Sequence, residues 1–259
     1  MLKKTALCVA PMLFISAHSS ADVIAVCSFE DASAGGKYYD TLDAGTSHQL
    51  LNNDGEADVN FGGSANEIGF TSWFIPNEYT MASPSNRGLA DGDWFGVTAY
   101  TGGGVESYPD GVQGFQMSDT DGFAQLRMDE VSGATSVSFS VFFPNTGWET
   151  SNPHDSFAVG FGVAGVDTGN LLDSGDEDLD DWFGTAAIDE GGWSFLTFDL
   201  TMLGVSTGSL QFTFESNASS EQVFIDNIVF EGQSSGPVVP GAGGFAVMIG
   251  VAGIRRRRR

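Results

Sequence analysis

The sequence predicts an all-β protein built on one antiparallel β-sandwich of the jelly-roll type. Short runs in which apolar and polar residues alternate follow one another along most of the 259 residues, as expected of half-buried strands. The 35 glycines and clusters of Asp and Asn separate these runs at the spacing of turns. No long stretch repeats its apolar residues with the period of an amphipathic helix. Two packed antiparallel sheets explain these observations best.

Residues 1–21 are typical of a secretory signal peptide. Lys3 and Lys4 precede a short apolar core, which is too short to cross a membrane as a stable anchor. Small residues, Ser19 to Ala21, then form a cleavage site, so the mature chain is expected to begin at Asp22.

Residues 22–233 are expected to form the sandwich. The strand-like runs include an opening strand that begins at Val23 and a closing strand, Gln222 to Phe230. Between them, the clearest alternating runs are 94–100, 123–128, 137–143, 157–163, 196–200 and 210–214. Residues 40–92 and 144–155 are less regular and predict long loops, with short strands near Val59 to Phe61 and Ile68 to Phe74 in the first of them. Because long loops often carry binding residues, we expect a binding rim there.

The closing strand contains an aspartate among apolar residues. Period-two alternation predicts that Asp226 shares a face with Phe224, Ile228 and Phe230. A buried carboxylate is costly unless a partner neutralises it. The opening strand ends near the carboxylates of Glu30 and Asp31, so we expect the first and last strands to be neighbours, with these carboxylates gathered around a cation.

The charge distribution argues against nucleic acid and anionic membranes as partners of the domain. The formal net charge is −24, but between the leader and the tail only Lys37, Arg87 and Arg127 stand against 34 acidic residues, which is a net charge of −31. Such a surface repels nucleic acid and anionic membranes. The acidic run 173–181 predicts a solvated loop. Cys27 is the one cysteine outside the leader, so it is expected to be a buried apolar side chain rather than half of a disulfide.

The C-terminal segment, residues 234–259, differs from the domain before it. A linker containing Pro237 and Pro240 leads into an apolar stretch, 241–254, and then into five arginines. Fourteen residues of helix reach about 21 Å, short of the ~30 Å hydrocarbon core. We therefore expect a hydrophobic sorting helix that anchors the chain transiently and provides its one contact with a membrane. The arginines are Arg255, Arg256, Arg257, Arg258 and Arg259.

This tail resembles the PEP-CTERM-type sorting signals of Gram-negative bacteria, in which prolines, an apolar segment and an arginine cluster follow one another. Val238 and Val239 separate the two prolines here, and the glycines of residues 241–244 are also similar to GlyGly-CTERM signals. The resemblance implies processing by an exosortase- or rhomboid-type sorting protease. It also implies delivery to the cell surface, the outer membrane or the extracellular matrix.

The domain itself resembles jelly-roll modules of secreted bacterial proteins, which are similar to carbohydrate-binding modules. The segments that carry the resemblance are 28–30, 91–97, 113–119 and 225–227. It implies a structural Ca²⁺ between the first and last strands, held by Glu30 and Asp226, with Asp31 or Asp40 completing the oxygen shell. The alternative is that turn amides bond to Asp226 and that water solvates Glu30.

A sugar-binding group is suggested in the 144–155 loop. Trp148 lies beside Glu149 and Asn152, and flat aromatic faces flanked by such polar groups bind pyranose rings. The alternative is that the indole anchors the core of the sandwich, as tryptophan usually does.

These observations lead to three functional hypotheses. The first is an exported, non-enzymatic protein of the cell surface or extracellular matrix, whose sandwich is an interaction domain for polysaccharide or a matrix protein. The second is a carbohydrate-binding module for exopolysaccharide. The third is a glycoside hydrolase with paired carboxylates. No nucleophile or metalloprotease motif is present, and we assign no catalytic residue.

Overall fold

The computed structural model describes thirteen segments of the chain. They are residues 21–32, 37–40, 47–49, 60–76, 94–102, 104–105, 107–120, 122–144, 148, 155–163, 169–175, 179–216 and 220–232. Residues 1–20 of the predicted signal peptide and the tail that follows Gly232 lie outside them. Within this part of the chain, no helix is both long and apolar enough to cross a membrane.

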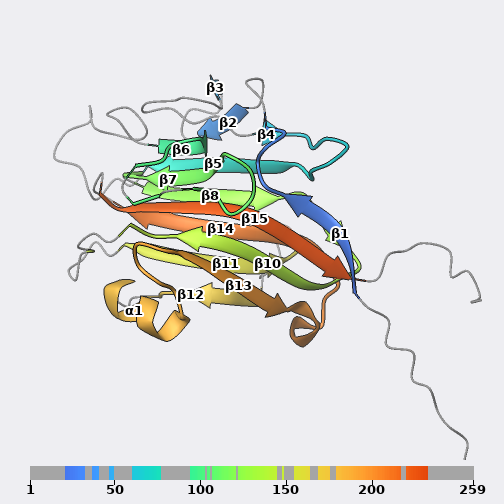
Figure 1. Ribbon diagram of the computed structural model, residues 1–259. Helices are drawn as coiled ribbons and strands as arrows, with labels where there is room; N and C mark the ends of the chain where they lie inside the picture. The colour runs from blue at the N-terminus through green and yellow to red at the C-terminus, as the bar shows by residue number, and fades with distance from the viewer. Residues whose placement is uncertain are drawn as a thin grey trace, which may run out of the picture.

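Two β-sheets stack face to face, which confirms the predicted sandwich (Figure 1). The six-stranded sheet has the order β13 (Trp193–Asp199), β10 (Ala134–Phe142), β15 (Gln222–Gly232), β7 (Gly114–Ser118) and β6 (Trp94–Thr98), with β1 (Asp22–Cys27) also paired to β15.

The nine-stranded sheet forms the second layer. Its order is β12 (Gly169–Asp173), β11 (Ser156–Gly162), β14 (Thr207–Ser216), β8 (Gly122–Met128), β5 (Phe70–Pro76), β2 (Lys37–Asp40) and β3 (Ser47–Gln49). The short strands β4 (Asn60–Phe61) and β9 (Val131–Ser132) pair with β5 and β14. The pairings are antiparallel except for β2 with β5.

The core fills the space between the sheets with aromatic side chains. Phe139 of the six-stranded sheet meets Phe212 of the other sheet edge to face, with ring centroids 5.0 Å apart. Cys27 is fully buried in this core as predicted, and burial raises the pKa of its thiol. The thiol therefore behaves as an apolar group rather than a nucleophile.

The first and last strands are neighbours, as the sequence predicts. β1 and β15 run antiparallel, and Cys27 lies opposite Ile228 while Asp22 lies opposite Gly232. Both ends of the domain therefore meet at one end of the sandwich. The helix α1 (Leu179–Ala186) lies at the opposite end (Figure 1).

The predicted face of the closing strand is partly wrong, and a β-bulge is the reason. Asn227 has a φ of 52°, and the register between β10 and β15 shifts there. The extra residue breaks the period-two alternation. Phe224 and Asp226 therefore lie on the outer face of the sheet, whereas Ile228 and Phe230 point into the core.

The prediction of a solvated acidic loop is also wrong in its last part. Residues Leu179–Ala186 form α1, which buries Leu179, Trp182 and Phe183. Asp180 and Asp181 lie in its first turn, where carboxylates are favoured by the helix dipole. A short 3₁₀ helix, η2 (Leu200–Leu203), is the other helical element of the described chain.

Candidate functional site

Glu30 and Asp226, predicted as cation ligands, are linked by one loop of the six-stranded sheet. Glu30 lies in the turn after β1, and Asp226 lies on β15 just before the bulge. The backbone N–H of Asp110 donates to Asp226 Oδ2 over 2.9 Å. The next residues of the loop, Val112 and Gln113, donate their N–H groups to Glu30 Oε1 over 2.7 and 2.9 Å.

This close approach requires a glycine in the loop. Gly111 has a φ of +77°, a backbone conformation that residues other than glycine rarely adopt. A Cβ at this position would lie 2.2 Å from Glu30 Oε1. The loop is therefore shaped around the Glu30 carboxylate.

Asp226 is an unusual acid for an outer sheet face because its side chain is fully buried. Burial raises its pKa to about 7, and the nearby charges of Asp110 and Glu30 add to the rise. Hydrogen bonds from the N–H groups of Asp110 and Asn227 oppose it. Near neutral pH this carboxyl therefore changes between its neutral and charged forms.

The two carboxylates are the type of ligand that a hard cation prefers, but two side chains are too few to fill its coordination shell. Glu30 and Asp226 offer carboxylate oxygens, which Ca²⁺ prefers. The pKa of Asp226 is raised because its two hydrogen bonds do not fully offset the cost of burying the charged carboxylate. Among the described residues, no three His, Cys, Asp or Glu side chains lie close enough together to hold a metal ion. Backbone carbonyls would have to complete the shell.

The two further candidate ligands are placed elsewhere. The Asp31 carboxylate accepts hydrogen bonds from Ser64 Oγ and from the Asn66 side chain, which lower its pKa. Asp40 belongs to β2 of the nine-stranded sheet, opposite Phe74, whereas the Glu30 and Asp226 pair belongs to the six-stranded sheet.

A buried carboxylate that the sequence analysis missed fixes the turn after β1. Glu67 accepts hydrogen bonds from the N–H groups of Ser28, Glu30 and Asp31 over 2.9, 3.2 and 3.1 Å. The Ser28 hydroxyl donates to it as well, over 2.6 Å. A local signal was available, because Ser64 and Glu67 have the Ser-x-x-Glu spacing, and Ser64 Oγ accepts the Glu67 N–H as in a capping box.

Trp148, predicted as an exposed sugar platform, lies in the core, so that prediction is wrong. Its side chain is 4% exposed. It packs against Phe143, Phe183 and Phe214, with ring centroids 5.9–6.3 Å apart. The space between the sheets needs a large side chain at this position, and an indole fills it. Glu149 and Asn152 lie outside the described residues.

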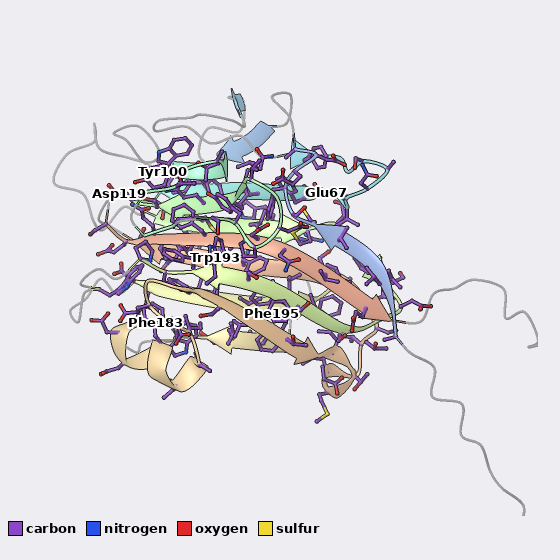
Figure 2. All side chains as sticks on the ribbon, viewed as in Figure 1. Glu67, Tyr100, Asp119, Phe183, Trp193 and Phe195 are labelled. Carbon is purple, nitrogen blue, oxygen red and sulfur yellow. The ribbon has the colours of Figure 1, made fainter. Side chains whose placement is uncertain are left out.

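Exposed aromatic side chains occur instead on the outer face of the six-stranded sheet. Phe195 is 62% exposed, Tyr100 is 46% exposed and Trp193 is half-buried (Figure 2). We call these three residues the aromatic face. Trp193 and Phe195 alternate along β13 and therefore point to the same side of the sheet.

A small second core holds the aromatic face in position. Phe142 and Phe224 lie opposite each other on β10 and β15, and the loop between β6 and β7 covers them. Tyr100 stacks on Phe224 with an interplanar angle of 11°. The Trp193 indole N–H donates to the carbonyl of Ser107 over 2.7 Å. Two of the three rings are thus oriented before any ligand arrives.

The aromatic face and the carboxylate pair are adjacent. Phe195 of β13 lies opposite Ser140 of β10, and Ser140 lies opposite Asp226 of β15. One cross-strand row therefore joins an exposed phenyl ring to the buried carboxylate. The loop that bonds Asp226 also supplies Tyr108, whose hydroxyl donates to the carbonyl of Tyr100 over 2.9 Å.

Comparison with known proteins adds likenesses of fold. No protein-family model and no curated protein matches the sequence. A family 61 carbohydrate-binding module in complex with β-1,4-galactotriose is 10% identical, with 53% of this chain and 81% of that chain covered and a TM-score of 0.35. A family 11 module from Clostridium thermocellum, bound to a mixed-linked tetrasaccharide, is 14% identical, with 67% and 92% covered and a TM-score of 0.33.

A cleaved adhesin domain of Lys-gingipain from Porphyromonas gingivalis resembles this fold about as closely as the two carbohydrate-binding modules do. It is 19% identical, with 47% of this chain and 73% of that chain covered and a TM-score of 0.30. Sequence identities and TM-scores this low do not identify a ligand for this chain, so the site must be judged from its own geometry.

Proposed function

We propose that this chain is an exported surface protein whose sandwich binds polysaccharide through the aromatic face. The observation that carries the proposal is the exposure of Phe195 and Tyr100 on an open sheet face. An aromatic side chain held in water gains free energy when an apolar surface covers it. The C–H face of a pyranose ring offers such a surface, and its hydroxyl groups stay in contact with water.

The arrangement of the rings supports a sugar rather than a compact apolar ligand. Tyr100 and Trp193 are fixed by packing on the second core, so little conformational entropy is lost when a flat ring stacks on them. Tyr100 also carries a hydroxyl that can exchange hydrogen bonds with a sugar. The face is open, as a long chain of sugar units requires.

The charge of the domain favours a neutral polysaccharide. The net charge of −31 between leader and tail repels uronic acid and sulfated polymers unless divalent cations bridge the two. We therefore expect a neutral glycan to bind more tightly than an acidic one, and we expect the acidic one to respond to added Ca²⁺.

Export and surface delivery are part of the same proposal. The leader with Lys3 and Lys4 and the tail with Arg255–Arg259 support passage across the inner membrane and retention at the envelope. The tail would be the substrate of an exosortase- or rhomboid-type protease. It begins after Gly232, which lies opposite Asp22, so a tethered domain would be held by one end.

A structural Ca²⁺ completes the proposal. Glu30 and Asp226 would be its carboxylate ligands, and the loop between β6 and β7 would supply carbonyl oxygens. The ion would contribute positive charge beside a buried carboxylate whose pKa is raised to about 7. The aromatic face would gain indirectly, because the same loop carries Tyr108 and covers the second core.

A glycan array tests the proposal. The full chain is applied to neutral and acidic polysaccharides in Ca²⁺ and again in EDTA. We expect saturable binding to a neutral glycan that Phe195→Ala and Tyr100→Ala each weaken at least tenfold. Met202→Ala is the matched control, because Met202 is 83% exposed and lies outside the aromatic face.

Two results would decide against it. Equal loss of binding in all three variants would show that the aromatic face has no special role. Release of shortened glycans from the array would instead revive the hydrolase hypothesis. Folding of each variant is checked by thermal unfolding, so that lost binding is not confused with lost structure.

A further inference from the structure

Among the described strands, β1 has a partner strand along one edge only, where it pairs with β15. On its other edge, the N–H of Ile68 donates to the carbonyl of Val26 over 2.9 Å. Beyond that bond the two segments diverge, and a groove of about 320 Å³ separates residues 23–26 from residues 64–68. Figure 1 shows the segment between β4 and β5 turning away from β1.

Hydrogen bonds brace this groove, which we call the β1 groove, at its closed end. Glu67 ties the segment 64–68 to the turn after β1 through the N–H groups of Glu30 and Asp31. The Asp31 carboxylate reaches back to Ser64 and Asn66. These four hydrogen bonds fix the segment 64–67 against the turn after β1.

The lining of the β1 groove suits an extended chain. The strand wall is apolar and incompletely covered, with Val23 60% exposed and Ile24 to Val26 half-buried. Edge strands are usually blocked by lysine, proline or a covering element, and β1 has neither residue. Main-chain groups on an open strand edge bind another strand, and the side-chain surface beside them adds apolar contact.

The charged residues near the groove indicate whether a bound segment should be acidic or basic. Asp22, which precedes Val23, is exposed, and Asp31 lies at the closed end beside Ser64 and Asn66. None of the lining residues is basic. A second copy of this chain would bring the same carboxylates and the same net negative charge, so charge complementarity favours a basic partner.

We propose that the β1 groove binds an extended segment of a partner protein that carries lysine or arginine, and that this segment joins the six-stranded sheet beside β1. This inference is separate from the sugar-binding proposal, because the aromatic face lies over β13 and the second core. Either can fail without the other.

The test uses the full chain labelled with ¹⁵N and a synthetic six-residue probe. The probe alternates valine and arginine and has blocked ends. We expect saturable shifts of the backbone amides of residues 23–26 and 64–68. Replacing arginine with glutamate in the probe should weaken binding at least tenfold. Methylating the amide nitrogens of alternate probe residues should have the same effect, because it removes the donors a strand needs.

A matched pair of variants places the probe in the groove. Ala65 is exposed on the groove wall, so Ala65→Phe fills the groove without entering the core, and it should weaken binding at least tenfold. Thr185→Phe places the same ring on exposed α1 at the opposite end of the sandwich and should leave binding within twofold.

Three results would overturn the proposal. One is the absence of shifts at millimolar probe, and another is equal binding of the methylated probe. The third is prior occupation of the groove. A dimer that Ala65→Phe dissociates would show that a second copy fills it. Amides of residues 23–26 that exchange slowly in the full chain but quickly after truncation at Gly232 would show that the chain's own tail fills it.

Discussion

Replacing Asp226 with asparagine tests how the fold tolerates its buried carboxylate. Burial raises the pKa of Asp226 from 3.8 to about 7, so in metal-free solution the folded protein prefers the neutral acid. The protonated carboxyl therefore makes its full contribution to stability below pH 3.8. That contribution is lost as the pH rises through about 7, where the carboxyl ionises in the folded protein. Each pH unit between the two values corresponds to about 1.4 kcal/mol, so the ionised group destabilises the fold by about 4 kcal/mol at pH 8.

Asparagine removes that penalty at a smaller cost. The carboxylate accepts one N–H from Asp110 and one from Asn227, on different oxygens. An amide has a single oxygen, so one donor loses its acceptor, which costs about 2 kcal/mol. In EDTA, Asp226→Asn should therefore be more stable than the native chain by about 2 kcal/mol at pH 8. At pH 4 it should be equally stable or less stable, because the native acid is then already protonated.

Urea unfolding followed by tryptophan fluorescence measures both differences. The reasoning is refuted if the variant is less stable at pH 8 in EDTA, or if its difference from the native chain is the same at both pH values. The same unfolding measurement with added Ca²⁺ tests the proposed ion site independently. If the ion binds as proposed, Ca²⁺ should stabilise the native chain at pH 8 and should have little effect on the variant.

Two further substitutions probe the core and the turn after β1. Trp148→Ala should lower the free energy of unfolding by about 3–5 kcal/mol, because it leaves a cavity beside Phe143 and Phe183, and urea unfolding would contradict this if the loss were below about 1 kcal/mol. Glu67→Ala should cost about 2 kcal/mol or more by removing the acceptor for three backbone N–H groups, and faster amide exchange at Ser28 should accompany the loss.

The strand framework could be predicted because its signals are local. Alternating residues such as those of 134–142 and 207–216 mark which side chains are buried, and turns rich in glycine and aspartate mark where each strand ends. The pairing of β1 with β15 was inferred from an opening apolar run that ends near Glu30 and Asp31 and a closing run that contains Asp226. These inferences needed only features that are visible over a few neighbouring residues.

The candidate site was less accessible to sequence reasoning because it depends on distant contacts. Trp148 has polar neighbours in sequence, but Phe183 and Phe214 bury it from other elements. Phe195 looks like a routine strand residue, and only its position on the outer face of β13 exposes it. Glu67 is one acid among 34, and its role appears only when the turn after β1 folds against it.

The bulge at Asn227 connects the fold to the site. If Asn227 instead continued the strand in regular period-two alternation, Asp226 would lie on the same face as Ile228 and Phe230, inside the aromatic core, where a buried carboxylate is costly. The bulge turns Asp226 outward instead, toward the N–H of Asp110. The single extra residue therefore lets Asp226 lie on the outer face, in one cross-strand row with Ser140 and Phe195, while Ile228 and Phe230 remain in the core.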